Sequence, residues 1–176
     1  MSKAIGIVGI GSYVPDRIVT NYDLEKIMDT SNDWILERTG IERRRVADKD
    51  TASSDLGVKA AEAALADAGL SAEDIDLIIT ATLSPDMIFP STACVIQEKI
   101  GAVNAAAFDL SAACTGFIYA ITTAKAFIAS GDAKKVLVIG TEAISKILNW
   151  EDRKTAVLFG DGAGAVVLAE TEEGKG

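Results

Sequence analysis

Short apolar runs alternate along the chain with longer stretches that mix apolar and polar residues, a pattern that predicts alternating strands and helices. The apolar runs predict strands at Ile5–Ile10, Ile41–Val46, Leu77–Thr82, Ala105–Leu110, Val136–Gly140 and Ala163–Ala169. The mixed stretches predict helices at Thr20–Met28, Thr30–Arg38, Ser53–Ala68, Pro90–Ile100 and Cys114–Ser130. This order predicts an α/β fold in which helices cover both faces of a mixed, mainly parallel sheet.

The composition fits a single domain with a large core. The 176 residues are 49% hydrophobic and 24% charged, and the apolar excess is mostly alanine, valine and isoleucine, as expected for buried strands packed against small-residue helices. The net charge of −9 excludes an extended nucleic-acid or anionic-membrane surface, because phosphate groups need clustered cations. A phosphorylated ligand must therefore be met by a few local arginines.

We expect a cytoplasmic protein without a membrane span. The apolar opening Ala4–Val14 has one lysine before it, Pro15 after it and no small-residue cleavage site, so it predicts a strand and not a secretory signal. No stretch comes near the roughly 18 uninterrupted apolar residues of a membrane helix. Two cysteines without a secretory signal are typical of a reducing compartment.

Cys114 lies where a predicted strand gives way to a long predicted helix, in the segment Asp109–Phe117. Helix N-termini present unpaired N–H groups and a partial positive charge, which can lower the pKa of a thiol from about 8.5 to roughly 3.5–7.5. A thiolate formed in this way can take an acyl group from a thioester. Taken alone, however, such a pattern more often marks a buried, unreactive cysteine.

The segment Ser111–Phe117 (Ser-Ala-Ala-Cys-Thr-Gly-Phe) resembles the active-site stretch of the beta-ketoacyl-[acyl-carrier-protein] synthase III family. Further segments match that family in place and in sequence: Ile7–Pro15, Ser31–Arg43, Phe89–Ser91 and Phe159–Ala165. The resemblance covers essentially the whole chain and implies a thiolase-like fold. It implies that residues 1–176 are the N-terminal, nucleophile-bearing domain, one βαβαβ-type half, and that the C-terminal half lies outside this chain.

The resemblance assigns Cys114 as the acyl-accepting nucleophile and four other residues to coenzyme A. It implies that Trp34 and Arg153 flank the adenine, and that Thr30 and Arg38 lie along the nucleotide end. From the residues alone, Trp34 and Arg38 share a helix face, where an indole can stack on a base and a guanidinium can pair with phosphate. The same pair also fits a partly buried tryptophan beside a surface arginine.

The acyl pocket follows from the same resemblance. It implies that Phe89, Ile144 and Phe159 line this pocket, with Phe89 reaching across a dimer into the pocket of the partner subunit. A phenylalanine at that position would shorten the pocket and favour short acyl groups. From the sequence alone, Phe89 also fits a core residue on a loop.

Several other features have plain interpretations. Gly6–Gly11 follows a strand pattern, as a dinucleotide-binding fingerprint does, but no helix opens after it. Gly160–Gly164 is likewise followed by strand-like residues, so both stretches predict backbone crowding where only glycine fits. Cys94 lies inside an apolar helix and fits a small buried residue. Arg43–Arg45 fits a solvated edge, or a contact with an acidic carrier protein.

The sequence contains no histidine, which excludes a Cys-His pair, a Ser-His-Asp triad or a histidine-bound zinc built from this chain alone. The resemblance implies an acyltransferase that initiates fatty-acid biosynthesis. Acetyl-coenzyme A, or another short acyl-coenzyme A, acylates the cysteine, and malonyl-acyl-carrier protein then undergoes decarboxylative Claisen condensation. The family supplies a histidine and an asparagine for that step from its C-terminal half. This chain alone is therefore expected to be inactive in condensation.

The resemblance further implies a homodimer, a coenzyme A thioester as substrate, no permanently bound cofactor or metal, and no nucleic-acid or membrane partner. Two alternatives stay open. One is a non-catalytic acyl-coenzyme A-binding or dimerisation module of the thiolase fold, which would lack a continuation containing histidine and asparagine. The other is a nucleotide-binding oxidoreductase domain, which would bind NAD and not coenzyme A.

Overall fold

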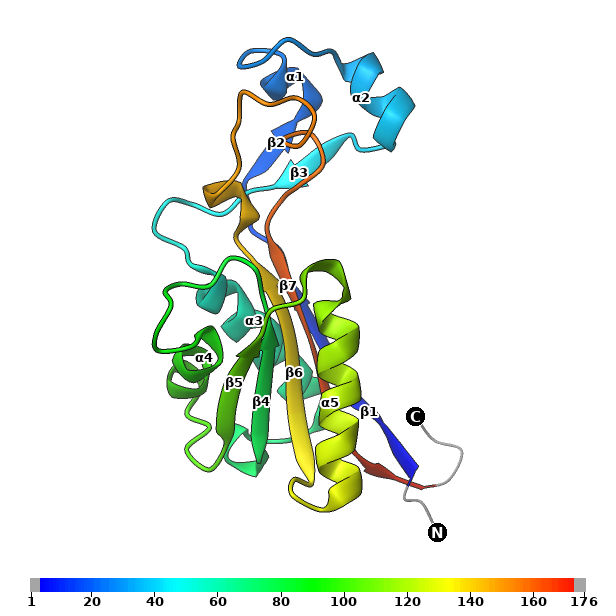
Figure 1. The fold of residues 1–176 in the computed structure, drawn as a ribbon, viewed down its shortest axis with the longest axis vertical. Helices are drawn as coiled ribbons and strands as arrows, with labels where there is room; N and C mark the ends of the chain where they lie inside the picture. The colour runs from blue at the N-terminus through cyan, green and yellow to red at the C-terminus, as the bar shows by residue number, and fades with distance from the viewer. Residues whose placement is uncertain (1–3, 173–176) are drawn as a thin grey trace.

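The computed structural model describes residues 4–172 and has a five-stranded sheet at its centre (Figure 1). Its strands, in spatial order, are β1 (Ala4–Tyr13), β7 (Gly162–Thr171), β6 (Lys135–Glu142), β4 (Leu77–Ala81) and β5 (Ala106–Leu110). β6, β4 and β5 are parallel neighbours, whereas β7 is antiparallel to both β1 and β6. All strands but β7 therefore point the same way, which confirms the predicted mixed, mainly parallel sheet.

Helices cover both faces of this sheet, as the sequence predicts (Figure 1). They are α3 (Ser53–Ala68) and α4 (Thr92–Ile100) on one face and α5 (Gly116–Ser130) on the other. Along β4, Ile78 packs with α3 and α4, whereas its neighbours Leu77 and Ile79 pack with α5. Because both faces are covered, the strand is buried at every position, and four of its five residues are apolar. We call this sheet with its three helices the sheet body.

β1 and α3 approach each other so closely that two positions of β1 admit only glycine. A Cβ added to Gly9 would lie under 3.0 Å from the carbonyl oxygen of Ala64, and one added to Gly11 would lie equally close to that of Ala60. A side chain at either position would force α3 away from the sheet, because protein interiors are close-packed and cannot absorb such an overlap. The stretch Gly6–Gly11 is thus crowded strand, as predicted, and not a dinucleotide fingerprint.

A smaller region lies beyond one end of the sheet (Figure 1), and we call it the cap region. It comprises β2 (Ile18–Thr20), α1 (Asn21–Leu24), α2 (Asn32–Thr39), β3 (Arg43–Arg45) and the segment 144–160. β2 and β3 pair antiparallel. Its core consists of five buried residues: Leu24, Met28, Ile35, Ala156 and Val157. Short 3₁₀ turns also occur: η1 (Ala72–Asp74), η2 (Ala113–Thr115) and η3 (Ile144–Lys146).

Arg44 corrects the expectation that Arg43–Arg45 is a solvated edge. Its side chain is buried in the cap region, where the guanidinium donates to Asn21 Oδ1 at 2.9 Å and to the Val157 carbonyl at 3.0 Å. Burial lowers the pKa of Arg44, and the two hydrogen bonds offset part of the cost of burying the charge. Arg44 is therefore a structural residue, and only its neighbours in β3 reach the surface.

Three predicted boundaries are wrong, each for a local reason. α1 ends at Leu24 and not at Met28, because the N–H groups of Lys26 and Ile27 bond three residues back and tighten the helix into a turn. The helix predicted from Cys114 begins at Gly116, after the 3₁₀ turn η2. The strand predicted over Ile41–Val46 is limited to β3, because its partner β2 has only three residues. Among the other boundaries the largest difference is at the end of β1, predicted at Ile10 and found at Tyr13.

One helical segment of the described residues, Ala113–Ser130, is long and apolar enough to cross a membrane. Lys125 and three threonines interrupt it, so it is not the run of uninterrupted apolar residues that the sequence analysis excluded. Length and composition are the whole of this evidence, and core helices pass the same test. The segment packs Ala120, Ala124 and Ile128 against the sheet at 0% exposure, although only 22% of it is buried.

Candidate active site

Cys114 occupies a tight turn between β5 and α5. The turn is a single 3₁₀ turn in which the Thr115 hydroxyl donates to the Ala112 carbonyl at 2.9 Å. The preceding residue, Ala113, has a φ of +49°, and among the described residues it is the one non-glycine residue with a positive φ. Such a conformation costs of order 1–3 kcal/mol and persists where the surroundings impose it. The turn leaves the side chain of Cys114 exposed.

The exposed thiol lines a cavity of about 420 Å³, a volume in the range of small-molecule sites. The walls are mostly apolar and come from the end of β6, the start of β7 and the turn itself. They include Ile144 and Phe159, which the sequence analysis assigned to the acyl pocket, and Phe117 from α5. Thus the structure brings two of the three predicted acyl-pocket residues to the thiol. Gly140, on the floor, leaves space for the ring of Phe117, which a Cβ would approach to 3.2 Å.

The third predicted acyl-pocket residue, Phe89, lies elsewhere. It is 87% exposed, on the loop between β4 and α4, and it does not line the cavity of Cys114 within this chain. Ile88 beside it is 100% exposed and Met87 is half-exposed. The role predicted for Phe89 in a partner subunit therefore stays a prediction.

Cys94 contrasts with Cys114. It is half-buried on α4, where the Ser91 hydroxyl donates to its sulfur at 3.2 Å and the thiol lies 3.7 Å from the Ala107 carbonyl. It lines none of the larger cavities of the described residues. This placement agrees with the plain interpretation of Cys94 as a structural residue.

The cap region brings together three of the four residues predicted to bind coenzyme A. The guanidinium carbon of Arg38 lies 4.5 Å from the centre of the Trp34 ring, and that of Arg153 lies 5.1 Å from it. Arg153 also donates to the Asp29 carbonyl at 2.8 Å and forms an exposed ion pair with the same residue. A half-buried indole between two cations can stack a base and place phosphates near both guanidinium groups.

Thr30, the fourth predicted residue, lies directly before α2. Its hydroxyl is buried and has no hydrogen-bond partner among the described residues. Buried hydroxyl groups are normally paired, so this one has capacity left for a donor or acceptor from a ligand. Ser31, the next residue, is the N-cap of α2 and accepts from the Trp34 N–H at 3.1 Å, which fixes the first turn of the helix that carries the indole.

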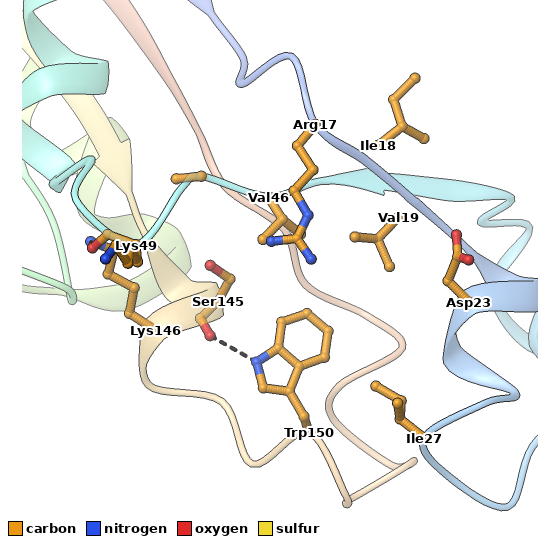
Figure 2. A pocket seen from close by; sticks show the side chains of 11 residues that line it. Arg17, Ile18, Val19, Asp23, Ile27, Val46, Lys49, Ser145, Lys146 and Trp150 are labelled. Carbon is orange, nitrogen blue, oxygen red and sulfur yellow. Dashed lines mark hydrogen bonds between the residues drawn. The ribbon is translucent and has the colours of Figure 1, made fainter.

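The largest cavity, of about 650 Å³, lies elsewhere in the cap region (Figure 2). Figure 2 shows Trp150 at its centre, with the indole N–H donating to the Ser145 carbonyl at 3.0 Å and with Arg17 and Lys146 at the rim. Neither cysteine and none of the predicted coenzyme A residues lines it. Cavity size alone would therefore place the active site away from the thiol. The presence of Cys114 among mostly apolar lining residues favours the smaller cavity as the active site.

Asp161 joins the cap region to the sheet body. Its carboxylate is 5% exposed and accepts from the Ala47 N–H at 2.7 Å, from the Ser145 N–H at 2.8 Å and from the Ser145 hydroxyl. It lies between Gly160, where a Cβ would come within 2.9 Å of the Arg45 carbonyl, and the start of β7. The glycine-rich stretch around it therefore allows close packing, and the carboxylate ties the segments at Ala47 and Ser145 to the start of β7.

Several residues that line the cavity of Cys114 were missed by the sequence analysis, and two of them differ in the signal that was available. Glu142, the last residue of β6, and Leu83, in the loop after β4, both line the cavity of Cys114. A signal for Glu142 was present, because polar residues at the carboxyl end of parallel strands commonly face ligand sites. Leu83 carried no such signal, since an apolar residue after a strand is common.

Comparison with known proteins finds similarity along almost the whole chain. Residues 108–176 match the family model described as 3-Oxoacyl-[acyl-carrier-protein (ACP)] synthase III. The chain is 60% identical over 172 residues to beta-ketoacyl-[acyl-carrier-protein] synthase III 1 of Bacillus anthracis, covering 98% of this chain and 56% of that protein.

Solved structures agree with the sequence matches. The crystal structure of 3-oxoacyl-[acyl-carrier-protein] synthase III from Aquifex aeolicus VF5 superposes with a TM-score of 0.92 at 54% identity, covering 98% of this chain and 55% of that one. The priming beta-ketosynthase of the R1128 polyketide pathway superposes with a TM-score of 0.93 at 38% identity, covering 97% and 51%. The chain thus spans about half the length of the relatives it matches.

The fold and the cysteine turn define a protein of the thiolase-like class. Within that class, the matches to proteins named synthase III extend over almost the whole chain at high identity. The chain thus resembles the beta-ketoacyl-[acyl-carrier-protein] synthase III family along about half the length of the relatives it matches.

Proposed function

We propose that this chain is the nucleophile-bearing N-terminal domain of a condensing enzyme that initiates fatty-acid synthesis. In this proposal a short acyl-coenzyme A, with acetyl-coenzyme A as the first candidate, acylates Cys114, and malonyl-acyl-carrier protein is the second substrate. The observation that carries the proposal is the exposed thiol of Cys114, held by a strained turn at a mostly apolar cavity of about 420 Å³. An exposed thiol in such a cavity favours acyl transfer over a purely structural role.

The proposed chemistry has two steps. In the first, the thiolate of Cys114 attacks the thioester carbonyl, the acyl–sulfur bond to the enzyme forms, and the coenzyme A thiolate leaves and takes up a proton. In the second, malonyl-acyl-carrier protein loses carbon dioxide and the resulting enolate attacks the acyl-enzyme carbonyl. The carbon–carbon bond forms and the thiolate of Cys114 leaves.

The second step needs preorganised donors for the enolate oxygen. The sequence has no histidine, so at least that donor of the family has to come from outside residues 1–176. We therefore propose that the chain by itself forms at most an acyl-enzyme and releases no carbon dioxide above background. The family resemblance places the missing histidine and asparagine in a C-terminal half.

For coenzyme A we propose Trp34, Arg38, Arg153 and Thr30 as the binding residues. A base stacked between two planar groups needs about 3.5 Å on each side. Arg153, now 5.1 Å from the centre of the Trp34 ring, therefore has to move outward when the adenine enters. Its ion pair with Asp29 is exposed and weak, so breaking it during this movement costs little free energy.

The test is acylation of the full-length protein by radiolabelled acetyl-coenzyme A, followed by peptide mass spectrometry. We expect the label on the peptide that contains Cys114, its loss in Cys114→Ala and its retention in Cys94→Ala. Added malonyl-acyl-carrier protein should discharge the label as product. Binding of coenzyme A without any acylation would instead support a non-catalytic module of the same fold, and labelling of Cys94 would contradict the assignment of the nucleophile.

A further inference from the structure

Glu142 has an arrangement that the proposed chemistry does not use. Its carboxylate lies at the cavity of Cys114, and yet every hydrogen bond it accepts comes from the loop after β4. Oε1 accepts from the Leu83 N–H at 2.8 Å, and Oε2 accepts from the Ser84 N–H at 3.0 Å, from the Ser84 hydroxyl and, more weakly, from the Thr82 hydroxyl at 3.4 Å. One side chain of β6 thus holds three consecutive residues of a loop that follows another strand.

The same contact continues into the interior as a chain of hydroxyl groups. The hydroxyls of Ser84 and Ser53 both accept from the Ala143 N–H, at 2.9 and 3.1 Å, and the Thr141 hydroxyl donates to the Ser53 carbonyl at 2.7 Å. The side chains of Ser53, Ser84 and Thr141 are all buried. Hydrogen bonds in such a network are costly to leave unmade, so the start of the loop has little freedom.

The far end of the loop is fixed in the same way. The carboxylate of Asp109 accepts from the Thr92 N–H at 2.8 Å and from the Ala93 N–H at 2.7 Å, at the first turn of α4. Between the two carboxylates the loop exposes Met87, Ile88 and Phe89. The loop is therefore a span held at both ends, and Leu83, at the end held by Glu142, forms part of the wall of the thiol cavity.

We propose that Glu142 is a positioning residue that sets the width of the Cys114 cavity by holding Leu83 and the loop behind it. A carboxylate can accept from all four donors at once. A glutamine of the same shape has one acceptor oxygen, and an NH₂ group replaces the other. This NH₂ group is a donor, so it cannot accept a hydrogen bond from a backbone N–H of the loop. In Glu142→Gln the loop must therefore move at Leu83 or Ser84 to satisfy its N–H groups, and the cavity wall moves with it.

The width of the cavity can be measured without any enzymatic activity. In a Cys94→Ala background, Cys114 is alkylated with iodoacetamide and with N-alkyl iodoacetamides of increasing chain length, and the rates are followed by intact-protein mass spectrometry. In the protein with native Glu142 we expect the rate to fall steeply with chain length. In Glu142→Gln we expect the ratio of long-chain to short-chain rates to rise by roughly tenfold. Loss of the negative charge changes the reactivity of the Cys114 thiol by the same factor toward every reagent. The ratio of long-chain to short-chain rates therefore reports only the change in the shape of the cavity.

Asp76 provides a matched control. Its carboxylate accepts from the Lys134 and Lys135 N–H groups at 2.8 and 2.9 Å, at the opposite end of the same strand β6 and away from the cavity. Asp76→Asn therefore also removes a carboxylate that holds backbone, and we expect it to leave the rate ratio unchanged. An unchanged ratio in Glu142→Gln would overturn the proposal, and so would an equal rise in both variants, because that would mean general loosening.

Ser84→Ala keeps the test decisive if Glu142→Gln does not fold. It removes one donor to Glu142 and leaves both backbone donors, so we expect a smaller rise of the ratio, about threefold. Glu142→Asp, which keeps the charge on a shorter stem, should give a rise between that of Ser84→Ala and that of Glu142→Gln. No rise in folded Ser84→Ala would count against the proposal.

The consequence for acyl-chain selectivity rests on the proposed function, whereas the width of the cavity does not. In the full-length protein we expect Glu142→Gln to accept longer acyl-coenzyme A substrates relative to acetyl-coenzyme A. If alkylation shifts as expected but no acyl group is transferred by the unmodified protein, the positioning role stands and the proposed function fails. If acyl transfer is normal and the alkylation ratio is unchanged, the positioning role fails alone.

Discussion

The sheet body and the cap region are held together in different ways. In the sheet body, long strands and helices bury alternating alanine, valine and isoleucine in two cores, one on each face of the sheet. In the cap region the elements are short, the core has five buried apolar residues, and buried Arg44 inside it and Asp161 at its boundary supply much of the cohesion through hydrogen bonds to backbone groups. The sheet body is stabilised mainly by apolar packing, whereas the cap region is stabilised to a larger extent by hydrogen bonds of buried polar side chains.

This difference divides the proposed site in two. The thiol and most of its cavity belong to the sheet body, with Ile144 and Phe159 added from the adjoining cap segment 144–160. Trp34, Arg38 and Arg153 belong to the cap region alone. A rigid body suits a nucleophile that must be held in a strained turn. A loosely built region suits a binding surface in which Arg153 must move to admit a base. Perturbing each region should therefore affect different properties.

The largest effect is expected in the sheet body, from Gly11→Ala. The new Cβ would lie under 3.0 Å from backbone atoms of α3, which cannot yield without separating the helix from β1. We expect a loss of about 3 kcal/mol or more in the free energy of unfolding, measured by urea denaturation. Gly164→Ala is the control, because a Cβ there would meet nothing closer than 3.9 Å. Similar stabilities for the two variants would contradict close packing of β1 on α3.

A smaller and more local effect is expected in the cap region from Arg44→Met. The methionine retains apolar volume but leaves the acceptors on Asn21, Val157 and Val19 unpaired, at a cost of roughly 1 kcal/mol each. Hydrogen exchange followed by mass spectrometry should show faster exchange in β2 and β3 and unchanged exchange in α3. Faster exchange throughout would show that the two regions unfold as one unit.

The smallest effect on stability, and a clear effect on binding, is expected from Trp34→Ala. Loss of the stacking surface should weaken coenzyme A binding by about 1–3 kcal/mol, measured by calorimetry on the full-length protein. Alkylation of Cys114 should stay unchanged, because the thiol belongs to the sheet body. Trp150→Ala removes the other indole that packs on the same small core and should leave the affinity unaltered. Equal losses in both variants would point to a collapse of the cap region.

The accuracy of prediction from sequence also differed between the sheet body and the cap region. α3 was predicted to the residue, because an alanine-rich middle, charges on one side and Gly69 at the end define a long helix locally. In the cap region the prediction placed α1 too long and omitted β2, because elements of three or four residues are fixed by their neighbours and not by their own pattern. Arg44 shows the same limit, since nothing in a run of three arginines indicates which one is buried.

The sequence by itself determined the alternation of strands and helices, the crowded glycines of β1 and the cysteine at a strand-to-helix turn, because each depends on residues close together in the chain. It also carried the family resemblance that named Trp34, Arg38 and Arg153. Tertiary structure alone decided that Ile144 and Phe159 meet the thiol while Phe89 does not, and that Glu142 holds a loop some 60 residues away in sequence. These contacts join distant segments through the order of strands in the sheet, and local pattern carries no information about that order.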